Sequence, residues 1–193
     1  MKKILICLYF VSAVFGSNNI EIPTSDNSLK VSNNGIKRYV VDNSSYIGFK
    51  SHKFAFVGVE GYFKTFSGNL ALNSDGSIAS LDGEIIIKSV FSDDEERDAH
   101  LLEADFLDEA KYPKGFLQSK KIEVTDGKVH ILCDLTLHGK TQEVPFTGVI
   151  GEKDGKLSLD LEAKIDIRDF EIQGSAIVSD SLSIILKTLW NEI

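Results

Sequence analysis

Strict alternation of apolar and polar residues is the sequence feature that most constrains this fold. It is clearest where charged or hydroxyl residues separate the apolar positions Leu157, Leu159, Leu161, Ala163, Ile165 and Ile167. Successive side chains of a strand point to opposite faces of a sheet, so this pattern predicts a strand with one buried and one solvent-facing side. The same period recurs in 66–72, 81–89, 129–137, 144–150 and 182–186.

Turn residues separate these apolar runs where hairpins require them. Each of four short connections contains a residue that tolerates positive φ: 74–76, 125–127, 138–140 and 153–155. Pairs such as Asp-Gly favour two-residue hairpin turns, so the sheet is predicted to be antiparallel and mostly a meander. Many short strands favour a closed or nearly closed sheet, because closure removes exposed edges.

One segment departs from this period and predicts a short helix. Leu102 and Phe106 are four residues apart within Asp98–Glu109, behind an acidic opening at 93–96 that suits a helix N-terminus. The sequence Lys111-Tyr112-Pro113 then ends the predicted helix. We therefore expect one or two short helices beside the sheet.

The N-terminal residues predict a secretory leader. Two lysines precede the apolar run Ile4–Phe15, which ends in small residues and is shorter than the about 20 residues of a membrane-spanning helix. We expect a signal peptide over 1–16, export to the periplasm and no integral membrane span. The Asn- and Ser-rich residues 17–37 predict a flexible polar tether, and 38–193 predict one folded domain.

Composition and residue placement argue against several classes of function. A formal net charge of −8 disfavours nucleic-acid binding. Cys133 is the one cysteine outside the leader, and its apolar predicted face should raise its pKa and leave the thiol inert. His130 and His138 alternate with inward Ile131 and Leu137 and are predicted to face solvent, so we expect no metal. No Gly-x-Ser-x-Gly elbow is present, and we expect no catalytic residues and no cofactor.

Four motifs, in order along the chain, resemble those of the YceI-like family. The most specific is the segment Arg97–Asp108, which reads RDAHLLEADFLD and precedes Lys111-Tyr112-Pro113. The other three are its glycine-phenylalanine motif, its late turn and its final DF motif, here Gly61–Gly68, Asp134–Thr141 and Ile165–Phe170. The resemblance covers about 39–186. It implies an extended eight-stranded lipocalin-like barrel, exported in many bacteria, that holds a polyisoprenoid or another long-chain amphiphile.

The predicted ligand-binding residues are one arginine and a set of large apolar residues. Arg97 opens the helix beside apolar strands, where its guanidinium could meet a phosphate or amide head group. The alternative is an ion pair with Asp98 that ties the helix to the barrel. The apolar candidates, each also compatible with a plain core position, are Phe49, Phe63, Phe66, Phe106, Leu135, Leu137, Phe146, Ile165 and Phe170.

These observations favour a periplasmic carrier or store for an isoprenoid or fatty-chain ligand over an enzyme. A lipid-modifying enzyme on the same scaffold remains an alternative, and it requires His52, His100 and a carboxylate to converge in one pocket. A second alternative is an interaction module whose barrel is filled by side chains, which a continuous cavity would exclude. The resembled family commonly forms homodimers, although no exposed apolar stripe in this sequence predicts one.

Overall fold

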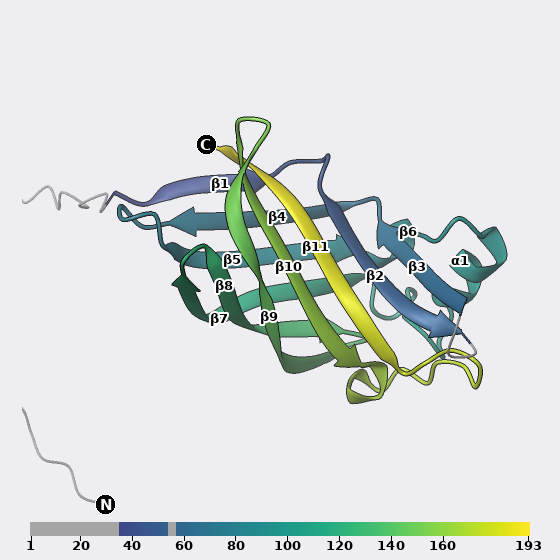
Figure 1. Cartoon of the computed structure of the whole chain (residues 1–193). Helices are drawn as coiled ribbons and strands as arrows, with labels where there is room; N and C mark the ends of the chain where they lie inside the picture. The colour runs from purple at the N-terminus through teal and green to yellow at the C-terminus, as the bar shows by residue number, and fades with distance from the viewer. Residues whose placement is uncertain (1–34, 54–56) are drawn as a thin grey trace, which may run out of the picture. The chain divides into compact units, whose positions relative to one another are not determined.

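The described part of the chain consists of eleven strand segments, one α-helix and two 3-10 helices. The computed structural model describes residues 35–53 and 57–193, so the predicted signal peptide and nearly all of the predicted tether lie outside the described residues. In chain order (Figure 1) the elements are β1 (Lys37–Val41), β2 (Tyr46–Lys53), β3 (Val57–Phe63), β4 (Phe66–Leu72), β5 (Ile78–Ile86), η1 (Ile87–Ser89), β6 (Val90–Phe91), α1 (Glu95–Leu101), β7 (Lys114–Thr125), β8 (Lys128–Leu137), β9 (Lys140–Lys153), β10 (Lys156–Asp166), η2 (Ile167–Phe170) and β11 (Ser181–Glu192).

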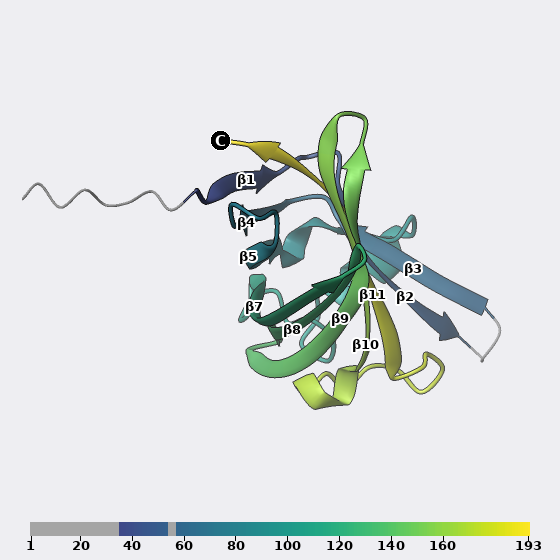
Figure 2. The same ribbon diagram turned by 60° about the vertical axis from the view of Figure 1, so that its left-hand side comes forward.

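Eight of these segments close into an antiparallel ring. The order is β1, β4, β5, β7, β8, β9, β10, β11, and β11 pairs back onto β1 through Val41↔Trp190 and its neighbours. The other three segments extend strands of the ring at one end, because β1 continues as β2, β3 continues as β4 and β5 continues as β6. The β2–β3 hairpin projects from this end (Figure 2). The predicted all-β fold, an eight-stranded antiparallel barrel with short helices, is confirmed.

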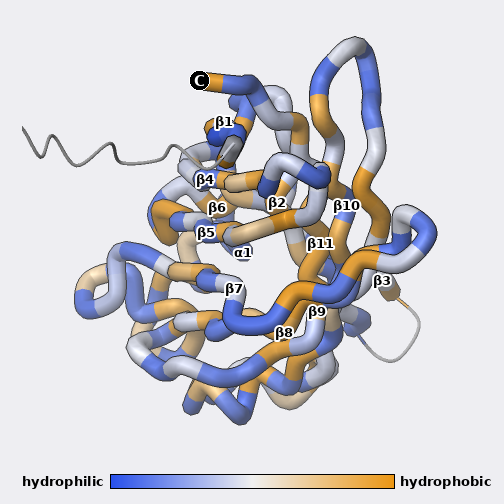
Figure 3. The backbone as a smooth tube through the Cα atoms, turned by 90° about the vertical axis from the view of Figure 1, so that its left-hand side faces the viewer, coloured by the Kyte–Doolittle hydropathy of each residue, from blue (hydrophilic) through white to orange (hydrophobic). Residues whose placement is uncertain are grey.

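Tight turns and alternating side chains build this barrel as the sequence predicts. The hairpins β7–β8, β8–β9 and β9–β10 turn through Asp126-Gly127, His138-Gly139 and Asp154-Gly155, and all six of these residues have positive φ. Two successive positive φ values match the right-handed twist of the flanking strands. The β9–β10 hairpin tip is hydrophilic, and hydrophobic and hydrophilic residues alternate along the strands below it (Figure 3).

Asp42 stabilises the turn that separates β1 from β2. Its carboxylate accepts hydrogen bonds from Lys156 Nζ, from Asn191 Nδ2 at 2.9 Å and from Ser44 Oγ at 2.6 Å, and its backbone N–H donates to Leu189 O at 2.7 Å. These bonds, led by that from Lys156, hold the pKa of Asp42 well below its ordinary range. The carboxylate therefore joins the turn to β10 and β11.

We expect Asp42→Asn to lower stability at neutral pH and to have little effect in acid. Because the pKa is depressed in the folded state, the stabilisation is present above the unfolded-state pKa of about 3.9 and is lost as the pH falls toward the folded value. Thermal unfolding measured from pH 7 to pH 2 checks this, with the exposed Asp160→Asn on β10 as the control. A difference in Tm that stays constant over this range would contradict the account.

The helix begins earlier and ends earlier than the sequence predicts. Asp94 accepts a hydrogen bond from the N–H of Arg97 as N-cap, and α1 ends at Leu101, so Phe106 lies in the following turns rather than in a helix over 98–109. The acidic residues belong to the first helical turn, where they complement the helix dipole. No helix in the described ranges has the length or apolar composition of a membrane-crossing segment.

Apolar side chains pack the barrel solidly at the end where β1 begins and β11 ends. The buried residues at this level come from the four strands β1, β4, β5 and β8: Tyr39, Leu70, Leu72, Ile78, Val129 and Ile131. The pairing registers place them together, because β1, β4 and β8 run antiparallel to their neighbours with these residues at matching ends. The opposite end of the barrel, beside α1 and η2, is built differently.

Candidate ligand-binding cavity

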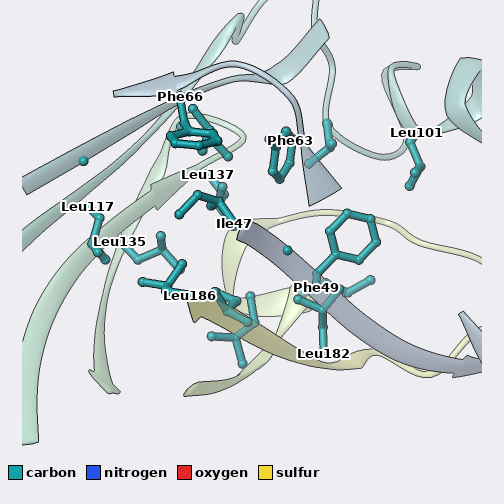
Figure 4. A pocket seen from close by; sticks show the side chains of 18 of the residues that line it. Ile47, Phe49, Phe63, Phe66, Leu101, Leu117, Leu135, Leu137, Leu182 and Leu186 are labelled. Atoms are coloured by element: carbon teal, nitrogen blue, oxygen red, sulfur yellow. The ribbon is translucent and has the colours of Figure 1, made fainter. Parts of the chain in front are cut away.

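A cavity of about 570 Å³ lies inside the barrel. This volume is within the range of about 300–1,000 Å³ that is usual for small-molecule sites. Side chains from facing walls converge on it (Figure 4), and the labelled residues are all apolar: Ile47, Phe49, Phe63, Phe66, Leu101, Leu117, Leu135, Leu137, Leu182 and Leu186. The interior is therefore not filled by side chains, and the condition for a filled interaction module is not met.

The length of the cavity can be followed along β11. Five inward-facing residues in succession line the wall: Leu182, Ile184, Leu186, Thr188 and Trp190. At about 3.3 Å per residue this row is about 26 Å long, or about 20 Å along the barrel axis after a strand tilt of about 40°. One leaflet of a bilayer, half of a hydrocarbon core of about 30 Å, is shorter. A tail longer than a membrane acyl chain can therefore lie along this wall.

Buried polar groups of the wall are already paired. Ser51 Oγ lies 3.2 and 3.1 Å from two backbone carbonyl oxygens of the segment 179–181. Thr188 Oγ1 donates to Leu159 O at 2.6 Å and accepts from Trp190 Nε1 at 2.9 Å. Among the described residues, no buried side-chain nitrogen or oxygen lacks a partner. The buried polar side chains of the wall, here called the deep wall together with the apolar residues around Thr188 and Trp190, thus leave a ligand mainly apolar surface and favour an apolar chain.

Two facing glycines widen the cavity on β4 and β5. Gly68 pairs with Gly83, and both line the wall. A Cβ added to Gly83 would meet only the backbone oxygen of Ser67, at 3.6 Å. A Cβ at Gly68 would lie 2.9 Å from the backbone oxygen of Asp82, which is too close, and 3.5 Å from Cη2 of Trp190. Gly68 therefore permits the close approach of the β5 backbone, and Gly83 leaves open space that a larger side chain would occupy.

The cavity reaches the protein surface beside α1, where its wall becomes polar. Asp94, Glu96 and His100 are exposed and line it there, together with the half-buried Arg97. The segment 93–108 carries eight acidic residues and one arginine. Lys53 of β2 is a second cation on the cavity wall, but the acidic residues of 93–108 outnumber the two cations, so this end, called the mouth below, has a negative potential.

Arg97 is tied into the protein by three of its nitrogens. Its Nε donates to Ser92 Oγ at 2.7 Å, and its Nη2 donates to the backbone oxygen of Ser92. Ser92 Oγ in turn donates to Asp98, so Arg97 and Asp98 are linked through a hydroxyl rather than by the direct ion pair considered from the sequence. The ion pair of Arg97 is with Asp94, at 3.7 Å. Arg97 thus anchors α1 and also lies on the wall.

The histidines do not form the pocket that the enzyme alternative requires. His100 lies on the wall, with Nε2 3.4 Å from Asp105 Oδ2 and 3.7 Å from Glu103 Oε2. His52 is exposed on β2 and does not line the cavity. His100, Glu103 and Asp105 could each turn one ligand atom toward a common point, but their side chains are at least 41% exposed and solvated. We assign no metal to them.

Two further residues test the side-chain alternation. His138 is half-buried rather than solvent-facing, with Nδ1 3.2 Å from Phe170 O and its ring against Tyr112, whereas His130 is exposed as predicted. The alternation fails at His138 because its φ of 49° takes it out of the strand. Cys133 is fully buried, and burial raises the pKa of its thiol to about 12, as the sequence suggests.

The structure brings nine of the ten predicted site residues to the cavity wall. They are Phe49, Phe63, Phe66, Arg97, Phe106, Leu135, Leu137, Phe146 and Ile165. Phe170, the last residue of η2, is buried in the core and does not line the wall. Sequence reasoning missed Ile47, Thr188 and Trp190, which the alternation around Phe49 and along β11 would have indicated.

Comparison with known proteins identifies the family of this barrel. A family model described as a YceI-like domain matches residues 39–188. The chain belongs to the YceI-like family. A UPF0312 protein of Pseudomonas putida strain W619 is 31% identical over 160 residues, which are 76% of this chain and 82% of the relative. The family resemblance predicted from the four motifs is confirmed.

Solved structures share the YceI-like fold. BcnA of Burkholderia cenocepacia has a TM-score of 0.67 at 23% identity, and the match covers 77% of this chain and 98% of that one. A polyisoprenoid-binding domain of Saccharophagus degradans has a TM-score of 0.60 at 14% identity, over 80% of this chain and 98% of that one. At these identities the similarity shows the fold.

Proposed function

We propose that this chain is a periplasmic carrier or store that holds the tail of a polyisoprenoid or another long-chain amphiphile in its barrel. The observation that carries the proposal is the cavity of about 570 Å³ with an apolar deep wall. Its relative in Saccharophagus degradans is a polyisoprenoid-binding domain, which supports the same ligand class. In this proposal, residues 1–16 are the export signal, 17–37 the tether and 38–193 the binding domain.

The energetics of burial support binding through the tail. Each buried CH₂ contributes about 0.8 kcal/mol, so a tail of roughly 20 carbons gains about 16 kcal/mol before costs. Ordering the tail and immobilising the ligand remove about 4–15 kcal/mol of this gain. The remainder is about 1–12 kcal/mol, and its upper part corresponds to micromolar or tighter binding without a strong polar contact.

The mouth favours an uncharged head group over a phosphate. Eight acidic residues against one arginine in 93–108 repel an anion, and Nε and Nη2 of Arg97 already donate to Ser92. We propose that Arg97 touches the head group through Nη1 at most, and that its main role is to hold α1. The proposal includes no catalytic step, because His52 and His100 do not share the cavity.

Native mass spectrometry of protein purified from its source organism tests this function. We expect an apolar species with an uncharged head group to copurify at about one per barrel, because the deep wall accepts one tail and no polar group. The Gly83→Leu variant, purified in parallel, is the matched control and should retain far less. Repeated isolation of protein without any apolar species would refute the carrier, and a phosphate-terminated ligand would refute the uncharged head group.

A further inference from the structure

Trp190 forms the inner end of the cavity. It is the last inward residue of β11 on the cavity wall, and its side chain is only 3% exposed. In the sheet it pairs with Val41 on β1 and Leu157 on β10, so its backbone is held from both sides. The residues packed beyond this level are buried and do not line the cavity: Tyr39, Leu70, Leu72, Ile78, Val129 and Ile131.

The indole of Trp190 is fixed in place by specific contacts. Its Nε1 donates to Thr188 Oγ1 at 2.9 Å, and that hydroxyl donates to Leu159 O at 2.6 Å. Both polar atoms are buried, so breaking this chain of bonds would leave them unpaired. Cη2 of the indole lies 3.5 Å from the position that a Cβ at Gly68 would take, so β4 packs against the ring at ordinary contact distance. A ligand that reaches Trp190 therefore meets a rigid apolar surface whose only donor is already used.

The two ends of the cavity differ in a way that orients an amphiphile. The mouth is polar and reaches the surface, whereas the end at Trp190 is buried and offers no free hydrogen-bonding group. A head group placed at Trp190 would lose its hydration without gaining a partner. We propose that the ligand lies tail-inward, with its terminal carbons against Trp190, and that Trp190 sets the longest tail the barrel accepts. This inference rests on the proposed function.

Fluorescence quenching tests the orientation in the unmodified protein, because Trp190 is the only tryptophan of the chain. The probes are two 20-carbon alcohols, one with bromine on the terminal carbon and one with bromine beside the hydroxyl. Bromine quenches indole fluorescence on contact. We expect the terminally brominated alcohol to remove most of the emission and the other to remove little. Equal quenching, or stronger quenching by bromine near the hydroxyl, would overturn the orientation.

A series of prenyl alcohols of increasing length tests the limit on tail length. In the wild type, affinity should rise about fourfold for each buried carbon and stop rising when the tail reaches the indole. In Trp190→Ala, and to a smaller extent in Trp190→Phe, the plateau should move to longer alcohols. Trp190→Phe keeps an aromatic ring in the core, so it provides the same test of the plateau if Trp190→Ala does not fold. Phe170→Leu, a truncation of a buried residue off the wall, should leave the plateau unchanged.

The outcomes separate this inference from the function on which it rests. If no alcohol of any length binds the wild type, the carrier itself is refuted. If the alcohols bind and the plateau is the same in wild type and both Trp190 variants, the carrier stands and Trp190 does not set the limit. A plateau that moves only in the Trp190 variants supports the proposal.

Discussion

Gly83→Leu should weaken the binding of a long-chain ligand about 200-fold while the barrel stays folded. Gly83 lies on the inward row of β5 between Leu81 and Ile85, and all three line the cavity. A Cβ added there meets only Ser67 O at 3.6 Å, an ordinary contact, so the rest of a leucine extends into open space. It then displaces about four carbons of the tail, at about 0.8 kcal/mol each.

Displacement of a fluorescent 20-carbon amphiphile measures this loss, and thermal unfolding reports whether the fold is intact. The matched control is Gly151→Leu on the exposed face of β9, where a Cβ would meet only Ser158 Oγ at 3.7 Å. This control should bind as the wild type does. If Gly83→Leu binds as tightly as the control, the ligand does not occupy the cavity and the proposed function is wrong.

Phe170→Ala should cost about 3–5 kcal/mol of stability, because it removes a large side chain that is 1% exposed. Phe170 is the one predicted site residue that does not line the cavity. We therefore expect the variant to bind the same ligand with nearly wild-type affinity at temperatures where it is folded. Denaturant unfolding and ligand displacement, performed on the same sample, check both parts.

The matched comparison for this prediction is Phe66→Ala. Phe66 is a half-buried residue of β4 on the cavity wall, so its truncation should cost less stability and change ligand affinity more. The separation between core and wall is supported if Phe170→Ala loses more stability than Phe66→Ala and Phe66→Ala loses more ligand affinity than Phe170→Ala. Should Phe170→Ala lose affinity as strongly as Phe66→Ala does, Phe170 is part of the site after all.

Alternation predicted the parts of this protein that are regular strands and failed where the chain leaves them. The inward rows of β8, β10 and β11 are where period two places them, because a strand allows no other arrangement of its side chains. Phe170 and His138 do not follow it, since one lies in η2 and the other has a positive φ at a turn. The helix bounds were wrong because the acidic residues that cap α1 resemble a preceding loop.

The cavity itself could not be predicted from the sequence. Whether Phe146 or Leu135 touches open space or another side chain depends on how far apart the facing walls lie, and barrel closure sets that distance. The turn at Asp42, which ends β1, depends on hydrogen bonds from Lys156 and Asn191, and both residues are remote from it in sequence. A composition rich in apolar residues is compatible with a filled core or with a hollow one.

Closure of the ring joins the two ends of the folded domain, and this has a consequence for how the chain folds. Tyr39 pairs with Glu192, 153 residues later, so the last seam of the barrel cannot form until nearly the whole sequence is free to fold. Contacts of such high sequence separation make folding slow. The meander from β7 to β11 can assemble locally beforehand, and the polypeptide remains without its final seam until its C-terminal strand arrives. Such a delay is compatible with the export proposed above, because a polypeptide passes through a translocation channel before it acquires a fixed shape.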